Sequence, residues 1–326
     1  MKKFLAVALV MMLSLALFAN GTQEGGAASG FTPTKDVEWT CTSKPGGGSD
    51  IFTQQIKDAL KTQGITDANV VISYVTDGGG EVGRLQVAMT GKNKADYTLL
   101  TFNSGDLMPM VKNTDNRIEN FTPLAVMAVD KQLLFIGENA KYKTWQEVLD
   151  AIKAGKKVVI AGSKGDDIET YNKLIAELGV SEAQLSYITN DSTSGAITSL
   201  LGGHVDLCMS KPAAAAQYVE AGKMKAILAL SQTRFTAESL KDAPTLSEFG
   251  YNNVEVPVWR GVVGPKAMSE EAAAFWSECL RQVSESQVWQ ENYIAKNGLV
   301  SEFKDYKAAK EYMTQYQADY LKSLGK

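Results

Sequence analysis

A glycine-rich segment, Lys44–Asp50, has the residues best suited to bind an anion. It follows Val37–Thr42, which predicts a strand, and it precedes an apolar stripe at helical spacing that begins at Ile51. Proline and three glycines let backbone N–H groups converge, and Ser49 or Asp50 is a suitable cap for the following helix. Such a turn forms an anion site because its free N–H donors and the helix dipole point the same way. The alternative is an ordinary turn at the start of a helix.

The ends of the predicted strands carry mostly small residues that can hydrogen-bond to an oxygen-rich ligand. In an open α/β sheet, ligands bind outside the carboxyl ends of the strands, so six such ends in succession predict one binding crevice. These ends are Lys44–Asp50, Thr76–Gly80, Asn103–Asp106, Gly162–Asp167, Thr189–Gly195 and Ser210–Pro212. The residues that we expect to bind the ligand are Gly46, Gly47, Gly48, Ser49, Asp50, Gly79, Asn103, Ser104, Ser163, Lys164, Ser192, Thr193 and Ser194.

The elements that must position these residues alternate between short apolar runs and helical patterns, which indicates an α/β fold. The strands are expected at Val37–Thr42, Val70–Val75, Tyr97–Phe102, Leu124–Ala128, Leu133–Gly137, Lys157–Ala161, Leu185–Ile188, Val205–Met209, Ala226–Ala229 and Val262–Gly264. The helices are expected at Ile51–Thr62, Gly80–Met89, Trp145–Ala154, Ile168–Leu178, Ser194–Leu201, Pro212–Ala221, Glu270–Ser284 and Tyr306–Leu321.

Known catalytic motifs are missing from the sequence. The glycine segments lack the GK[ST] end of a P-loop and the GxGxxG run of a dinucleotide site, and there is no GxSxG nucleophile elbow. The single histidine, His204, is better explained as a polar residue at a turn than as a base. Asp166 and Asp167, near Glu169, could hold a hard cation, but they fit a role in the first turn of a helix better. We therefore expect no enzymatic activity, no cofactor and no metal.

Composition excludes further classes. The chain is 44% hydrophobic and 21% charged, with a formal charge of −4 and no basic stripe, so we expect no nucleic-acid partner. Cys41, Cys208 and Cys279 lie far apart in apolar runs and are expected to be buried free thiols, although a pairing of two of them stays open.

The N-terminus has the features of an export signal. Lys2 and Lys3 precede an apolar stretch, and a cleavage site is expected after Ala19, which gives a signal peptide at residues 1–19. Residues 20–32 are rich in Gly, Ala and Ser and are expected to form a flexible leader. No cysteine lies near the cleavage site, so we expect a periplasmic protein with no lipid anchor.

Taken as a set, several motifs resemble those of the solute receptors of tripartite tricarboxylate transporters, also called Bug receptors. The matching stretches are Pro45–Asp50, Gly78–Gly83, Ala95–Leu100, Leu201–Asp206, Arg234 with Ala243–Gly250, and Trp259–Val262. They occur in order across nearly all of the mature chain. Tyr187–Ser192 departs from the tyrosine-lysine-glycine stretch common in the family, so the pocket wall is altered.

The resemblance implies an α/β fold of the type II periplasmic binding protein kind, with two lobes that are each a mixed sheet flanked by helices. Two crossover segments would form the hinge, with residues 33–125 and 258–326 in the first lobe and residues 126–257 in the second. The implied function is capture of a small carboxylate, such as a di- or tricarboxylate, by a monomer that delivers it to the membrane subunits of the transporter. The alternatives are a sensing module for a membrane kinase or, less readily, an exported enzyme for anionic substrates.

Overall fold

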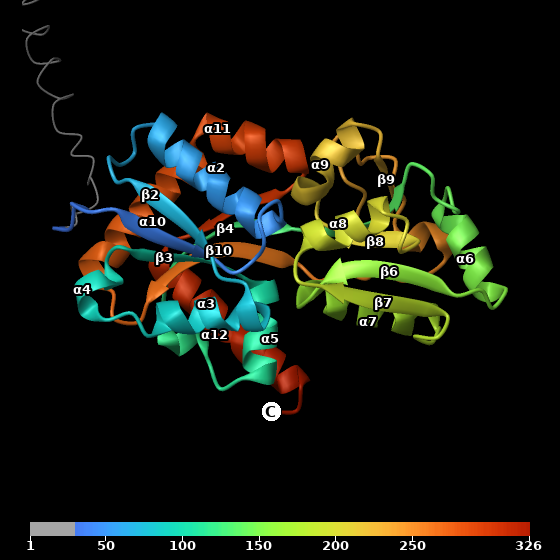
Figure 1. Cartoon of the computed structure of the whole chain (residues 1–326), viewed down its shortest axis with the longest axis horizontal. Coiled ribbons are helices and arrows are strands. Elements are labelled where there is room, and N and C mark those ends of the chain that lie inside the picture. The colour runs from blue at the N-terminus through green and yellow to red at the C-terminus, as the bar shows by residue number, and fades with distance from the viewer. Residues whose placement is uncertain (1–29) are drawn as a thin grey trace, which may run out of the picture.

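The computed structural model describes residues 30–326, which form two lobes side by side, each built on its own β-sheet (Figure 1). Lobe 1 contains the six-stranded sheet, with strand order β11-β4-β10-β3-β1-β2, and lobe 2 contains the five-stranded sheet, with order β7-β6-β8-β5-β9. Pairing is parallel in β2-β1-β3 and β7-β6-β8 and antiparallel elsewhere. The predicted fold class of two mixed sheets with flanking helices is confirmed.

The strands of lobe 1 are β1 (Val37–Cys41), β2 (Val70–Tyr74), β3 (Thr98–Asn103), β4 (Phe121–Asp130), β10 (Val258–Pro265) and β11 (Val300–Lys304). Those of lobe 2 are β5 (Gln132–Gly137), β6 (Val158–Ser163), β7 (Leu185–Asn190), β8 (Leu207–Ser210) and β9 (Met224–Leu230).

The helices that pack on the lobe 1 sheet are α2 (Gly48–Thr62), α3 (Glu81–Ala88), α4 (Lys92–Ala95), α5 (Ser104–Asn113), α10 (Glu270–Glu285), α11 (Gln287–Trp289) and α12 (Tyr306–Ser323). Those of lobe 2 are α6 (Trp145–Lys153), α7 (Asp166–Leu178), α8 (Thr193–Leu201) and α9 (Pro212–Glu220). Short 3-10 turns cover Asp77–Gly80 (η1), Ile118–Asn120 (η2) and Leu246–Phe249 (η3), and a π-helical turn covers Gln290–Ala295 (η4).

Apolar side chains fill both faces of each sheet, which explains why most strands read as continuous apolar runs. In lobe 1, Trp39 lies in the core on one face of the sheet, and Trp259 lies in the core on the other face. Trp145 and Phe135 hold the corresponding places in the two cores of lobe 2. Helices placed over these faces point their N-termini toward the carboxyl ends of the strands that precede them.

The chain crosses between the lobes at two points that lie close together. Strand β4 pairs with β10 as far as Asp130, and β5 begins at Gln132 in the other sheet. The change of sheet therefore lies at Lys131, whereas the sequence placed it between residues 125 and 126. The chain returns to lobe 1 where β10 begins, at Val258.

The sequence did not predict the short helices α4 and α11, nor two longer elements. Helix α5 occupies Ser104–Asn113, where we predicted only a strand-end loop, and it contains Pro109. Strand β11, at Val300–Lys304, is half-exposed and carries charged residues, so it lacks the apolar run used to recognise the other strands.

The expected signal peptide at residues 1–19 and nearly all of the expected leader lie outside the described residues. Phe31 already packs edge-on against Tyr97 and Phe275 of lobe 1. Within residues 30–326, no helix is both long and apolar enough to cross a membrane. The three cysteines are buried free thiols, as predicted.

Candidate functional site

A small polar cavity lies between the two lobes, at the carboxyl ends of strands from both sheets. Its volume is about 50 Å³. It is lined by Thr42, Ser43, Gly48, Ser49, Asn103, Gly105, Asp106, Ser163, Lys164, Asp166, Asp191, Thr193, Lys211, Val258 and Arg260. The expectation that strand ends converge on one crevice therefore matches the place where this cavity lies.

The first wall of the cavity is the N-terminus of α2. The residue at the N-cap is Gly47, and the helix begins at Gly48, so neither Ser49 nor Asp50 caps it as the sequence suggested. The Asp50 carboxylate instead accepts from the Gly46 N–H at 2.7 Å and from the Tyr74 hydroxyl at 2.6 Å. The N–H groups of the first helical turn have no partner within the helix, so those of Gly48 and Ser49 remain available to a ligand.

Two side chains of lobe 1 support this turn. Asn103, at the end of β3, donates from Nδ2 to Ser49 Oγ at 3.1 Å. Arg260 of β10 lies directly behind Gly48, where a Cβ atom would stand 2.7 Å from Arg260 Nη2. Arg260 itself forms a two-pronged ion pair with Asp130, at 3.1 and 2.5 Å. A glycine at position 48 is therefore needed for this close approach.

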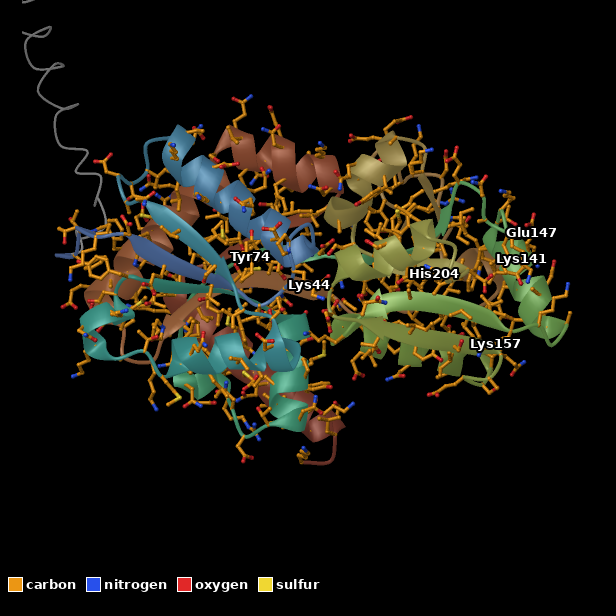
Figure 2. All side chains as sticks on the ribbon, viewed as in Figure 1. Lys44, Tyr74, Lys141, Glu147, Lys157 and His204 are labelled. Carbon is orange, nitrogen blue, oxygen red and sulfur yellow. The ribbon has the colours of Figure 1, made fainter. Side chains whose placement is uncertain are left out.

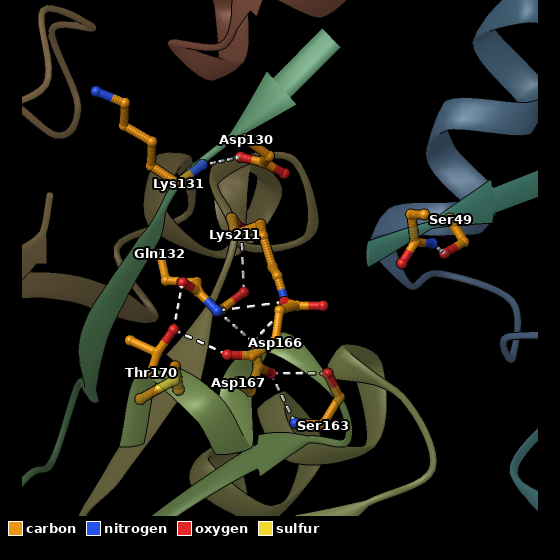
Figure 3. Close-up of polar contacts among 12 residues, drawn as sticks. Ser49, Asp130, Lys131, Gln132, Ser163, Asp166, Asp167, Thr170 and Lys211 are labelled. Atoms are coloured by element: carbon orange, nitrogen blue, oxygen red, sulfur yellow. Dashed lines mark hydrogen bonds and ion pairs between the residues drawn. The ribbon is translucent and has the colours of Figure 1, made fainter. Parts of the chain in front are cut away.

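The wall formed by lobe 2 contains a buried network of paired charges (Figure 3). Lys211 Nζ lies 2.5 Å from Asp166 Oδ2 and also contacts Asp167 Oδ1. Gln132 donates to both carboxylates, at 3.2 and 3.1 Å. We call Lys211, Asp166, Asp167 and the side chains bonded to them the Lys211 network; its other members are Gln132, Ser163 and Thr170.

The Lys211 network is fully engaged inside the protein. Burial alone would lower the pKa of Lys211, but the two carboxylates outweigh it and raise that pKa above its ordinary value. Burial raises the pKa of Asp166 to about 6, against the pull of Lys211. Burial also acts to raise the pKa of Asp167, but Lys211 and the hydrogen bonds from Ser163 and Gln132 bring it below its usual value. Asp166 and Asp167, which we considered from the sequence as a possible cation site, thus pair with the ammonium of Lys211.

On the opposite side of the cavity is a second set of charges. Asp106, in the first turn of α5, accepts at Oδ1 from Thr42 Oγ1 at 2.8 Å and from Arg84 Nη1 at 2.9 Å. Arg84 also donates from Nε to Glu81 Oε2 at 2.8 Å. We call Asp106, Arg84, Glu81, Thr42 and the neighbouring Lys164 the Asp106 group.

Lys164 extends from lobe 2 to the second glycine turn of lobe 1. A Cβ atom on Gly79 would stand 3.2 Å from Lys164 Nζ, so two residues predicted for the site meet across the lobes. Nζ is buried and has no hydrogen-bond partner among the described residues. Burial lowers the pKa of Lys164, Asp106 opposes this, and Arg84 adds to it. Lys164 is thus a cation whose ammonium is buried beside the cavity, and not a solvated surface charge.

The lobes touch through small residues. The backbones of Gly105 on α5 and Gly165 before α7 are so close that a Cβ on Gly165 would stand 2.5 Å from the Gly105 carbonyl oxygen. Lys44 pairs with Asp191 at 2.9 Å, and Ser194 Oγ donates to the Pro45 carbonyl oxygen at 3.2 Å. Figure 2 shows Lys44 where the two lobes meet. The cavity is thus closed by direct contacts between lobes.

The predicted site residues fall into two sets. Those that line the cavity are Gly48, Ser49, Asn103, Ser163, Lys164 and Thr193. Those that shape its turns or lie beside it are Gly46, Gly47, Asp50, Gly79, Ser104, Ser192 and Ser194. Ser192, for example, is the N-cap of α8 and accepts from the Gly195 N–H at 3.3 Å.

Sequence reasoning missed most of the charged residues in this region, namely Arg84, Asp106, Asp130, Asp191, Lys211 and Arg260. Several stood inside segments already singled out, such as Asp106 in Asn103–Asp106 and Lys211 in Ser210–Pro212. The sequence does not show which of these charged residues pair with one another. Lys211 and Asp167, for instance, come from different strand ends and meet only in the fold.

The remaining candidates lie away from the cavity or are part of the core. His204 is exposed in the turn before β8, within lobe 2 and away from Lys44 at the contact between the lobes (Figure 2). Tyr312 and Tyr316 of α12 pack edge-on against Trp259 and are part of the core of lobe 1. Residues 30–326 contain no group of three or more His, Cys, Asp or Glu side chains placed to hold a metal ion.

Two lobes joined by closely spaced crossings, with a polar cavity between them, define a two-lobed binding protein. The sequence profile of the family described as tripartite tricarboxylate transporter family receptor matches residues 52–323. The chain belongs to this family of binding receptors, which are not enzymes.

Individual relatives agree with this assignment. Protein BugT of Bordetella pertussis (strain Tohama I) is 22% identical over 274 residues, which cover 81% of each chain. The structure of the periplasmic binding protein BugD superposes with a TM-score of 0.77 at 22% identity, covering 90% of this chain and 98% of BugD. MatC of Rhodopseudomonas palustris, solved with bound malate, superposes with a TM-score of 0.75 at 19% identity, covering 89% of this chain and 98% of MatC. At these identities the structural likeness establishes the fold.

Proposed function

We propose that this protein is a periplasmic receptor that captures a small organic carboxylate between its lobes and delivers it to the membrane subunits of a tripartite tricarboxylate-type transporter. The observation that carries the proposal is the cavity at the N-terminus of α2, between the two sheets. Family membership supports the transport role, and the malate bound in MatC is a small carboxylate of the proposed kind.

Helix dipoles favour an anion at two places in this cavity. Five helices that follow strand ends start around it. Of these, α5 and α7 have Asp106, Asp166 and Asp167 in their first turns, which offset their dipoles, and α9 begins with Pro212, which has no backbone N–H to donate. In α2 the acidic residue is Asp50, whose carboxylate accepts a hydrogen bond from Tyr74. Helix α8 has no acidic residue in its first turn. A ligand carboxylate is therefore best placed between the N-termini of α2 and α8.

The expected affinity follows from these contacts. Hydrogen bonds to a charged group contribute roughly 1.5–3 kcal/mol each, and a helix terminus adds about 0.3–1 kcal/mol. Three or four such bonds reach the ~8 kcal/mol of a micromolar complex only before ordering costs are subtracted. Contacts from both lobes are thus required, and we propose that the lobes close on the ligand.

The size of the cavity supports this movement. A volume of about 50 Å³ is well below the ~300–1,000 Å³ of typical small-molecule sites. The lobes must separate before an organic acid can enter. Of the predicted binding residues, Ser163, Lys164 and Ser192–Ser194 would then approach the ligand from lobe 2.

The test is the substitution Gly48→Val. Its side chain would overlap Arg260 and cover the N–H groups at the start of α2, so we expect carboxylate binding to weaken by at least ~100-fold, the equivalent of ~3 kcal/mol. Binding is measured by calorimetry with the carboxylic acids that raise the melting temperature of the unmodified protein.

Gly91→Val is the matched control, because a Cβ at Gly91 meets only Asn93 Oδ1, at 3.4 Å. Circular dichroism should show the same secondary structure for both variants. Unchanged affinity in a folded Gly48→Val protein would refute the anion site at α2.

A further inference from the structure

The cavity contains one buried carboxylate oxygen that nothing satisfies. Asp106 is only 6% exposed, and its Oδ1 atom is already bonded to Thr42 and Arg84. Its Oδ2 atom is buried and has no hydrogen-bond partner among the described residues, although Asp106 lines the cavity. A buried polar atom without a partner is costly, and in native proteins it commonly marks the place of a missing donor.

The other charges around the cavity are already paired. Among the described residues around the cavity, the ion pairs are Lys44 with Asp191, Arg84 with Glu81 and Asp106, Lys211 with Asp166 and Asp167, and Arg260 with Asp130. The exception is Lys164, whose ammonium is buried without a partner. The cavity thus presents one unpaired cation and one unpaired carboxylate oxygen.

This distribution of paired and unpaired groups limits the charge that a ligand can have. One carboxylate is accommodated by Lys164 and the two helix N-termini. A second carboxylate would find no unpaired cation, and it would lie near the carboxylates of Asp106 and Asp166, which are both buried. Repulsion between like charges is strong in such surroundings, so a second negative charge is disfavoured.

We propose that the ligand is a carboxylate that also carries a protonated amine, and that Asp106 Oδ2 accepts a hydrogen bond from this amine. Lys164 Nζ and the N-termini of α2 and α8 hold the ligand carboxylate. The inference rests on the proposed function and narrows it, because it selects amino-bearing acids among the small carboxylates. Asp106 is the residue that makes the selection.

The proposal predicts a difference between ligands of the same shape. An amino acid should bind more tightly than the acid in which hydrogen replaces its ammonium group, and the matched pairs are L-aspartate with succinate, L-glutamate with glutarate, L-alanine with propionate, and L-phenylalanine with 3-phenylpropionate. A hydrogen bond between charged groups corresponds to a preference of about 10- to 100-fold for the amine. Calorimetry of each pair measures this ratio.

Asp106→Asn should abolish the preference, reducing the ratio to about one for every pair that binds. Because this variant also disturbs the bonds to Thr42 and Arg84, the control is Thr42→Val, which removes one bond to Oδ1 and leaves Oδ2 unchanged. Thr42→Val should keep the ratio even if both affinities fall. General damage to the site would lower both affinities without removing the preference.

Each possible result either supports or overturns the proposal. A preference for the amine that only Asp106→Asn removes supports the proposal. Equal or tighter binding of the acids without an amine overturns the proposal. In that case a water molecule between Asp106 and Lys164 would satisfy both groups, and the proposed receptor function would be unaffected. Failure of every acid in the panel to bind the unmodified protein overturns both.

Discussion

Two groups of charges line the same cavity, and they differ in how completely they are paired. In the Lys211 network, the lysine is bonded to two carboxylates, and these accept further hydrogen bonds from Gln132 and Ser163. In the Asp106 group, Asp106 Oδ2 and Lys164 Nζ lack partners. Both groups are buried, so the difference does not come from exposure to water.

The contrast separates structural charge from charge that serves a ligand. A buried ion pair with complete hydrogen bonding needs nothing further and fixes the elements that carry it, here α7 against β8. A buried group without a partner lowers stability and persists where function requires it. Substitutions in the two groups should therefore affect different properties.

The largest effect on stability is expected from Lys211→Met. It leaves Asp166 and Asp167 buried together without a counter-charge, and breaking a buried ion pair costs about 3–5 kcal/mol. The matched variant Lys164→Met removes an ammonium that has no partner, so the free energy of unfolding should change by less than ~1 kcal/mol. Unfolding in urea measures both values.

The same two variants also test the comparison of the two groups through ligand binding. Lys164→Met should weaken carboxylate binding while it keeps the stability of the protein. If Lys164→Met destabilised the protein as much as Lys211→Met, the two groups would not differ in the way their pairing indicates.

The next largest effect concerns closure. A methyl group at position 105 would overlap the Asp166 carboxylate, which the Lys211 network holds in place, so Gly105→Ala should keep the lobes apart. We expect ligand affinity to fall at least ~10-fold, about 1.4 kcal/mol. X-ray scattering at saturating ligand should show a smaller decrease in radius of gyration than for the unmodified protein.

Gly91→Ala is the control, since that glycine is away from the lobe contact and a Cβ there meets only Asn93. A Gly105→Ala protein that still closes fully would show that this contact does not limit closure.

The smallest effect is a pH dependence. Burial raises the pKa of Asp166 to about 6, so between its ordinary value and pH 6 the folded protein binds this proton and the unfolded chain does not. The contribution of Asp166 to the free energy of unfolding thus increases as pH falls from 7 to 5, and it is lost as pH rises through 6. Relative to Asp166→Asn, the unmodified protein should gain stability over this range.

Urea unfolding of both proteins at pH 7 and pH 5 measures the difference. The titration belongs to Asp166 and Asp167 together with Lys211 and Arg260, which face them. A stability difference that does not change with pH would show that Asp166 stays charged throughout.

Most of the fold could be predicted from the sequence because the buried strands are apolar along most of their length. In β5, for example, every residue from Leu133 to Ile136 is apolar and buried. The exceptions have physical reasons. Helix α5 contains Gly105 and Pro109, which disfavour a helix by propensity, and its packing against β3 and β10 overrides that preference.

The candidate site could be predicted in part. Small residues at strand ends are local signals, and Gly48, Ser49 and Asn103 were found from them. Charge pairing is not local, since Arg84 meets Asp106 and Arg260 meets Asp130 only after the sheets have formed. For this reason the sequence identified the turn at the cavity but not the charges that line it.

Helix α12 packs on the sheet of lobe 1 and ends at the other lobe. The Tyr320 hydroxyl lies 3.2 Å from Glu169 Oε1 on α7, beside a hollow that Lys164 and Gly79 also line. The carboxyl end of the chain lies near this contact, and Lys326 Nζ donates to the Lys112 carbonyl oxygen of α5 at 3.1 Å (Figure 1). A purification tag fused after Lys326 would stand near the contact between the lobes, so affinities should be measured after its removal. A fluorophore attached there would, for the same reason, report on closure.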